Sequence, residues 1–218
     1  MFAFSTLSIL ATLALSAFTS AAPFASTGVV SSVEDLVAVP DVPSLVPRAT
    51  AGVYEVITTV TETIRPQVAE LTFLTAQNAT VDNISNIVVG IRTVLGTALV
   101  DVQGLMCEST DVILAPIEGT VLITVAELAE VVSELLILVF EALGFVLTIV
   151  SADILPSVTY LLASLAEVVG CLLCAVIMLV DNILVGLVGA LVPLISSILS
   201  IIGSLNITII VAVLGLSI

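Results

Sequence analysis

Two stretches of the chain, residues 121–140 and 158–177, carry nearly the same apolar sequence, and they constrain the fold more than any other feature. When the two are aligned, ten of twenty positions are identical, including the run Leu-Ala-Glu-Val-Val. The offset of 37 residues predicts a duplicated helical unit. Coincidence is the alternative interpretation, because the whole chain is rich in Leu, Val and Ala.

Each of the two stretches has one narrow polar face. The spacing of Glu127, Glu130, Glu134 and Glu141 puts the four carboxylates within about 60° of one another on a helix. The same construction groups the polar residues of the second stretch: Ser157, Tyr160, Ser164, Glu167, Cys171, Cys174 and Asp181. A helix that is apolar over most of its circumference packs on several sides or lies in lipid. We therefore expect both helices at the centre of the fold.

Local signals predict how these two helices begin and meet. Thr124 and Glu127 have the spacing of a capping box, and Pro156 separates the two stretches. We expect an antiparallel helical hairpin. Small residues four apart allow close helix approach, and they occur as Ala166 with Gly170 and as Gly186 with Ala190.

The remaining segments also follow a helical period. Residues 53–75 predict a helix with a kink or break at Pro66, and residues 82–106 predict a more ordinary amphipathic helix. After Asp181 an uncharged run to Ile202, broken by Pro193, precedes a last short segment. The fold class is therefore predicted as all-α: a bundle of about five helices over residues 49–218, with a very apolar central hairpin.

The first 48 residues predict targeting and processing rather than fold. Residues 1–22 have the apolar core and small final residues of a secretory signal, without the usual basic start. Residues 23–48 contain four prolines and no apolar period, which indicates a disordered linker or pro-segment. Arg48 follows Val-Pro and is a candidate processing site; a plain linker is the alternative.

The amino-acid composition limits the classes of partner that the protein can bind. Hydrophobic residues make up 60% of the chain and the mean hydropathy is +1.36, so lipid or protein contacts must cover much apolar surface. Lys is absent, Arg occurs three times, and the net charge is −15. Nucleic acid is thereby excluded as a partner, since phosphate binding needs clustered cations. Anionic membrane surfaces are disfavoured for the same reason.

The residue inventory argues against catalysis. Without His or Lys the usual general bases, triads and Schiff-base chemistry have no residues to use, and no glycine-rich phosphate loop is present. The acidic spacing from Glu127 to Glu134 is typical of a solvated helix face. We expect no enzyme activity and assign no catalytic, cofactor-binding or metal residues.

Two kinds of covalent modification are predicted. Three cysteines are too few for a zinc site, and a helical Cys-x-x-Cys lacks the thioredoxin context. In an oxidising compartment they predict one disulfide, from Cys107 to either Cys171 or Cys174. Three acceptor sequences for N-glycosylation occur, at Asn78, Asn83 and Asn206.

The layout resembles small secreted helical proteins of fungi. The features that carry the resemblance are the leader MFAFSTLSILATLALSAFTSAAP, the Val-Pro-Arg junction and the Leu/Val-rich helices with few bases. In layout the chain is similar to the hydrophobic-surface-binding and cell-wall mannoprotein family. That similarity implies adsorption to apolar surfaces or residence in a cell wall, and it implies no particular site residues.

Three functional hypotheses follow. The first is a non-enzymatic secreted or wall-associated protein that self-associates or binds hydrophobic surfaces or lipid. The second is an integral membrane protein with helices in residues 120–218, because residues 182–202 carry no charge; no Lys or Arg flanks those segments to orient them. The third is an extracellular lipid or sterol carrier with a cavity between the central helices.

Overall fold

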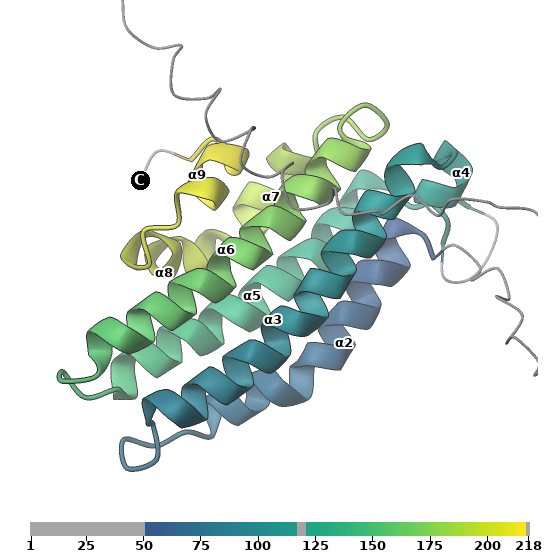
Figure 1. Ribbon diagram of the computed structural model, residues 1–218. Helices are drawn as coiled ribbons and strands as arrows, with labels where there is room; N and C mark the ends of the chain where they lie inside the picture. The colour runs from purple at the N-terminus through teal and green to yellow at the C-terminus, as the bar shows by residue number, and fades with distance from the viewer. Residues whose placement is uncertain (1–50, 117–120, 217–218) are drawn as a thin grey trace, which may run out of the picture. The chain divides into compact units, whose positions relative to one another are not determined.

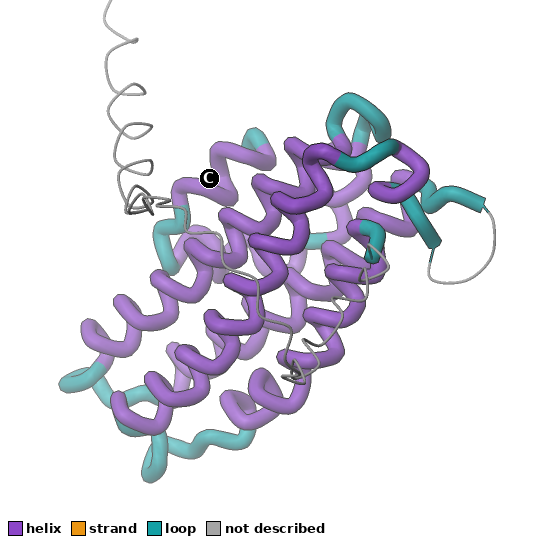
Figure 2. Tube along the Cα trace, turned by 45° about the vertical axis from the view of Figure 1, so that its right-hand side comes forward, coloured by secondary structure: helices purple, strands orange, loops and turns teal. Residues whose placement is uncertain are grey.

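The computed structural model describes residues 51–116 and 121–216. The chain divides into two units, Met1–Ser44 and Leu45–Ile218, and all described residues belong to the second. The predicted signal (1–22), linker (23–48) and processing site at Arg48 lie outside the described residues. Within these, every regular element is a helix (Figure 2).

Four long helices and several short ones make up this unit. The long helices are α2 (Val53–Thr72), α3 (Val81–Gly104), α5 (Val125–Ile149) and α6 (Leu155–Val180). The short ones are η1 (Leu105–Cys107), α4 (Thr110–Ile113), α7 (Leu187–Leu194), η2 (Ser196–Ile198), α8 (Leu199–Ser204) and α9 (Thr208–Leu214). The all-α class is confirmed, but about five helices was wrong: the described residues form eight α-helices and two 3₁₀ helices.

The C-terminal run accounts for most of the difference. Two residues in the left-handed conformation, Gly186 at φ 98° and Asn206 at φ 54°, precede α7 and α9. Pro193, the expected breaker, is the next-to-last residue of α7, and the run bends by 60° just after it, so the predicted break is confirmed. By contrast, α2 continues as one helix through Pro66, where a kink or break was predicted. Glycine's freedom and asparagine's tolerance of positive φ set the starts of α7 and α9.

The expected start signals of the central helices are present. The Thr124 Oγ1 accepts a hydrogen bond from the Glu127 backbone N–H at 3.3 Å, and the Glu127 Oε2 accepts one from the Thr124 N–H at 2.8 Å. This reciprocal capping box satisfies two donors that helix geometry leaves free. Pro156 lies in the first turn of α6, where its missing N–H costs no helical hydrogen bond.

The unit has three layers (Figure 1). The hairpins α2–α3 and α5–α6 stack so that α2 packs along α5 and α3 along α6. On the far side of the α5–α6 hairpin, α7 and α8 pack against α5, and α9 packs against α6. The α5–α6 hairpin is therefore the middle layer. This explains why both helices are apolar around most of their circumference, as expected for central helices.

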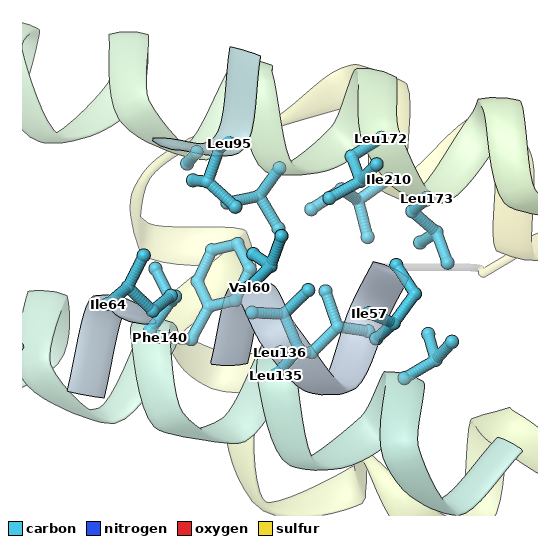
Figure 3. Close-up of a cluster of buried hydrophobic side chains, with 14 of the residues drawn as sticks. Ile57, Val60, Ile64, Leu95, Leu135, Leu136, Phe140, Leu172, Leu173 and Ile210 are labelled. Carbon is cyan, nitrogen blue, oxygen red and sulfur yellow. The ribbon is translucent and has the colours of Figure 1, made fainter. Parts of the chain in front are cut away.

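Side chains from all three layers meet in the core (Figure 3). Ile64 of α2 lies beside Phe140 of α5, and Ile210 of α9 lies beside Leu172 of α6. These four side chains are at most 1% exposed. Burying one such side chain contributes about 1.5–3 kcal/mol. The C-terminal helices thus complete the core and are not an appendage to a finished four-helix bundle.

Candidate functional site

The acidic side chains of the described residues lie on the first two layers and their connections, and all of them are exposed. Each of the fourteen Asp and Glu residues in the described part of the chain is exposed. They include the predicted stripe of Glu127, Glu130, Glu134 and Glu141 on α5. With Arg65 and Arg92 the described residues carry two positive and fourteen negative charges, a net charge of −12. The side of α5 that carries the four glutamates is therefore a solvated helix face.

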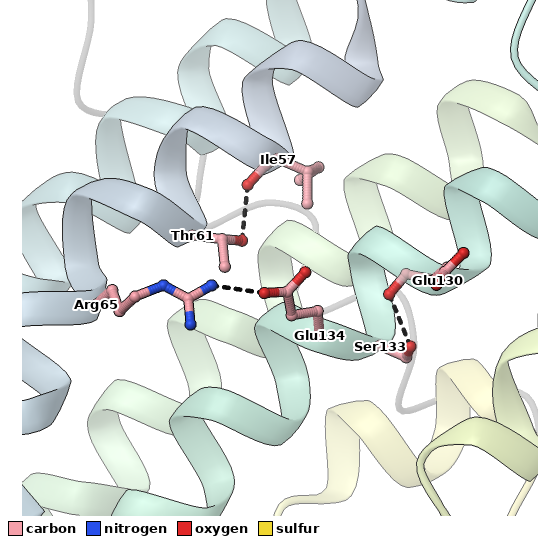
Figure 4. Close-up of polar contacts among 6 residues, drawn as sticks. All are labelled: Ile57, Thr61, Arg65, Glu130, Ser133 and Glu134. Carbon is pink, nitrogen blue, oxygen red and sulfur yellow. Dashed lines mark hydrogen bonds and ion pairs between the residues drawn. The ribbon is translucent and has the colours of Figure 1, made fainter.

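A charged group lies near the midpoint of each long helix, and we call this set the charged girdle: Arg65, Arg92, Glu134 and Glu167. Arg65 of α2 and Glu134 of α5 form an ion pair, Nη2 to Oε1, at 2.5 Å (Figure 4). Their side chains are 54% and 52% exposed. Arg92 of α3 donates to the Ser164 Oγ of α6 at 3.4 Å. The first two layers thus carry charge at mid-height.

The third layer has no such groups. Residues 182–216, which we call the uncharged face, contain no Asp, Glu, Lys or Arg. Val185 and Leu194 are 84% and 44% exposed. Further apolar side chains of this face are half-buried: Val188, Val192, Leu199, Ile201, Ile209, Val211 and Val213. Serines supply most of its polar groups, so the face is neutral and largely aliphatic.

A groove of about 570 Å³ lies on the uncharged face, at α8, α9 and the turn between them. Ile207, Val211 and Leu216 contribute apolar walls, and Asn206 and Thr208 contribute polar atoms. Asn206 is exposed and belongs to the third glycosylation sequence. A glycan on this asparagine would leave the protein directly from the uncharged face.

The other two predicted glycosylation sites lie far from that face in sequence, at the α2–α3 turn. The Asn78 Oδ1 accepts a hydrogen bond from the Thr75 N–H at 2.6 Å, and the Asn83 Nδ2 donates one to the Asn78 carbonyl at 2.8 Å. Both asparagines are exposed. Glycosylation at all three positions stays a prediction.

The predicted disulfide is not formed: Cys107, Cys171 and Cys174 are all free. The register of α3 against α6 gives the physical reason. Relative to the bonded pair of Arg92 and Ser164, Cys107 lies eight residues further along than Cys171 and five further than Cys174. At 1.5 Å per residue these offsets correspond to about 12 and 7.5 Å of helix.

Few ionisable groups are perturbed. The Thr124 backbone N–H, and then its hydroxyl, lower the pKa of Glu127. A hydrogen bond from Ser151, followed by backbone hydrogen bonding, lowers the pKa of Asp153. Burial raises the pKa of the Cys171 thiol, with smaller contributions from Cys174 and Glu167. None of these groups faces another in a cleft, so nothing here resembles an acid–base pair.

The interior between the central helices is tightly packed. The void enclosed by residues such as Leu136, Val169 and Leu172 measures about 10 Å³, roughly the room for a single water. A lipid or sterol does not fit there in this conformation. The carrier hypothesis gains no support from the core.

Length and composition alone allow a membrane interpretation. Three helical segments are long and apolar enough to cross a bilayer: Val81–Cys107, Val125–Ile149 and Leu155–Val180. A fourth crossing is added if Leu187–Leu194 and Ser196–Ser204, bent by 60° at their junction, form one broken span.

Comparisons with protein-family models, with curated proteins and with solved structures found no match.

Proposed function

We propose that this is a non-enzymatic, secreted or wall-associated helical protein that adsorbs to hydrophobic surfaces through its uncharged face. The observation that supports the proposal best is the separation of charge between layers. Fourteen exposed acids lie on the first two layers and their connections, whereas residues 182–216 carry none and expose Val185 and Leu194. The two sides of this unit therefore differ in charge, while large apolar side chains are exposed on both.

Adsorption draws its free energy from apolar area removed from water, about 25 cal/mol per Å² before entropic losses. The uncharged face offers such area without placing an ionised group against the surface. Meanwhile the acidic layers stay hydrated, and their mutual repulsion keeps the free protein from aggregating. An adsorbed layer would then present its negative charge to water.

The same arrangement favours one geometry of self-association. A contact between two copies through any acidic layer brings like charges together, which is unfavourable at short range. A contact between two uncharged faces does not. Self-association through α7–α9 would therefore compete with adsorption for the same side chains.

Two matched double variants test the proposal. Val185→Glu with Leu194→Glu adds two charges to the uncharged face, and Val89→Glu with Val100→Glu adds two charges to exposed positions of α3. Both change the net charge equally, so only the location differs. We expect the first pair to lower adsorption to alkyl-coated beads and at an air–water interface, and the second pair to leave adsorption near that of the wild type.

Circular dichroism should show unchanged helix content in both variants, since all four positions are exposed. Equal loss of adsorption in the two variants would indicate a general charge effect and contradict the assignment of the face. Adsorption that neither variant reduces would contradict it as well.

An integral membrane protein is the second candidate, and the three segments of sufficient length and apolarity favour it. The charged girdle opposes it. If α2, α3, α5 and α6 spanned a bilayer together, Arg65, Arg92, Glu134 and Glu167 would lie near its centre while remaining exposed at the bundle surface. Each such group costs about 3 kcal/mol at mid-bilayer. Extraction of cell membranes with alkaline carbonate separates the candidates, because an integral protein is retained and an adsorbed one is released.

A further inference from the structure

A pocket lies between the N-terminal turns of α3 and α6, which pack side by side and begin at the same end of the bundle (Figure 1). Its volume is about 500 Å³, which is within the range of pockets that hold small ligands. None of the residues around it belongs to the uncharged face. The walls come from both helices: α3 contributes Asp82 and Ser85, and α6 contributes Pro156, Ser157, Tyr160 and Leu161.

Tyr160 gives this pocket an aromatic ring that is open to solvent, since the residue is 76% exposed. The face of an aromatic ring carries the negative part of its quadrupole and attracts positively polarised C–H groups. A pyranose sugar presents C–H groups on one face of its ring and hydroxyl groups around the edge. The Tyr160 ring, with Pro156 and Leu161 beside it, therefore suits the apolar face of a sugar.

Three polar side chains of the same pocket suit the hydroxyl groups of a sugar. Asp82 offers carboxylate oxygens as acceptors, and Ser85 and Ser157 each offer a hydroxyl that both donates and accepts. None of the three side chains is hydrogen-bonded to another residue in the described part of the chain. Their donors and acceptors are therefore free for a ligand.

The charge around the pocket favours a neutral ligand. No Lys or Arg lines it, and the described residues carry a net charge of −12. A phosphate, sulfate or uronic acid group would be repelled by this negative field. By contrast, a neutral hydroxyl donates to the Asp82 carboxylate in a charge-assisted hydrogen bond, which is stronger than one between neutral groups.

The two walls are held in place by the core. Ile84 of α3 and Val158 and Leu162 of α6 are fully buried, and each lies within a residue of a side chain that lines the pocket. The walls thus belong to long helices that are already packed together. Binding loses little conformational entropy under these conditions, which favours affinity.

We propose that this pocket is a binding site for neutral saccharides. Tyr160 stacks on one pyranose ring, and Asp82 accepts hydrogen bonds from its hydroxyl groups. Because the pocket and the uncharged face share no residue, saccharide binding does not depend on adsorption to hydrophobic surfaces.

The strongly exposed aromatic ring of Phe73 provides a matched control at the same end of the bundle. Phe73 is 78% exposed and lines another pocket, together with Asn78 and Asn83. In that pocket the Asn78 Oδ1 and the Asn83 Nδ2 already form the hydrogen bonds of the α2–α3 turn. Fewer polar groups are therefore free there, and we expect no saccharide binding at Phe73.

Isothermal titration calorimetry of the full-length protein with linear oligosaccharides of glucose, of mannose and of N-acetylglucosamine tests the proposal. We expect at least one of the three to bind, with an affinity that salt hardly changes, because the ligand is neutral. Tyr160→Ala should weaken binding at least about 10-fold, as the loss of an aromatic anchor does at other binding surfaces. Tyr160→Phe should retain most of the affinity, and Asp82→Asn should lower it.

Tyrosine emission adds a local readout, since the chain has no Trp and only two Tyr residues. The saccharide should change the emission of the wild type but not that of Tyr160→Ala, in which only Tyr54 emits. Circular dichroism should show unchanged helix content in Tyr160→Ala, because the side chain is exposed.

Two further variants should bind the saccharide as the wild type does: Phe73→Ala, and the double variant Val185→Glu with Leu194→Glu on the uncharged face. The proposal is overturned if none of the three oligosaccharides binds. It is also overturned if Tyr160→Ala retains the wild-type affinity, or if Phe73→Ala lowers the affinity as much as Tyr160→Ala does.

Discussion

Gly170 of α6 faces Ile209 of α9 so closely that a Cβ atom at position 170 would lie 2.4 Å from the Ile209 Cγ2. That methyl group is attached to the branched Cβ of isoleucine and has little freedom to move away. The expected close approach at Gly170 is therefore real, and the segment that approaches is α9. Gly186, the other position for which close approach was expected, has nothing within 4 Å and instead supplies a positive φ before α7.

Gly170→Ala should destabilise the fold. The added methyl group forces α9 away from α6, and overpacking of this kind typically costs about 1–3 kcal/mol. Urea unfolding followed by circular dichroism measures the change. Gly144→Ala is the closest control, because the atom nearest its new Cβ is the Ile201 Cδ1 at 2.8 Å, at the flexible end of that side chain. We expect a smaller loss there, and equal losses at both sites would contradict this account of α9.

Gly96→Ala should stabilise the fold, the opposite of the effect expected for Gly170→Ala. Gly96 lies inside α3, and an added Cβ would meet nothing within 4 Å. Alanine in an exposed helix interior is about 1 kcal/mol more favourable than glycine. The midpoint of urea unfolding should therefore rise. A lower midpoint would indicate a contact at this position that the structure does not contain.

The capping box should make part of the stability dependent on pH. Hydrogen bonds from Thr124 lower the folded-state pKa of Glu127, so the ionised carboxylate stabilises α5 above its unfolded-state pKa. This contribution is lost as pH falls through the folded-state pKa. Glu127→Gln should therefore be less stable than the wild type at neutral pH, with a difference that shrinks in acid. Asp153, whose pKa is also lowered, contributes with the same sign.

Comparing urea midpoints at neutral and acidic pH checks this prediction. Thr124→Ala removes the other half of the box and should cost about 1 kcal/mol at neutral pH. A difference between wild type and Glu127→Gln that grows in acid would show that the carboxylate does not act through the cap.

The ion pair of Arg65 and Glu134 should matter little to stability. Both side chains are more than half exposed, so water and salt screen their attraction. We expect Arg65→Ala to destabilise the fold by less than about 1 kcal/mol, and the effect to fade at high salt. A large loss that persists in high salt would show that the Arg65 side chain acts by packing rather than by charge.

Glycosylation at Asn206 and adsorption should oppose each other. A glycan there covers part of the uncharged face, whereas one at Asn78 leaves from the α2–α3 turn. Thr208→Ala removes the Asn206 acceptor sequence without touching the residue at positive φ. If glycopeptide mapping finds Asn206 occupied, this variant should adsorb more strongly than the wild type.

Asn78→Asp is the matched control for that experiment. The aspartate keeps an oxygen that can accept the hydrogen bond from the Thr75 N–H, so the turn should be preserved while its glycan is lost. We expect its adsorption to equal that of the wild type. Stronger adsorption after loss of the Asn78 glycan would place the contact surface elsewhere.

The sequence predicted the central hairpin well, because its charges mark the helix faces. Glu127 to Glu141 lie on one exposed side of α5, and the Thr124 cap lies where expected. Both signals are local, and a helix places residues three and four apart on one face regardless of the rest of the fold. The boundaries of α2 and α3 followed from the same periodicity.

The C-terminal layer could not be predicted in the same way. Between Asn182 and Leu216 no charge distinguishes one helix face from another, so periodicity carries little information. The turn at Asn206 depends on a left-handed backbone conformation that no residue pattern in the sequence predicted. The absence of the predicted disulfide has a similar origin, since the packing of α3 on α6 decides whether Cys107 and Cys171 come within bonding distance.

The place of α7–α9 in the fold also bears on how the protein is made. These helices leave the ribosome after the rest of the bundle, yet Ile210 and its neighbours cover the apolar side of α6. Until residue 210 has been translated, the nascent chain contains most of the domain, but the apolar side of α6 is still exposed to solvent. Folding of this protein in the cell should accordingly depend on chaperones that bind such exposed apolar surfaces and prevent their association.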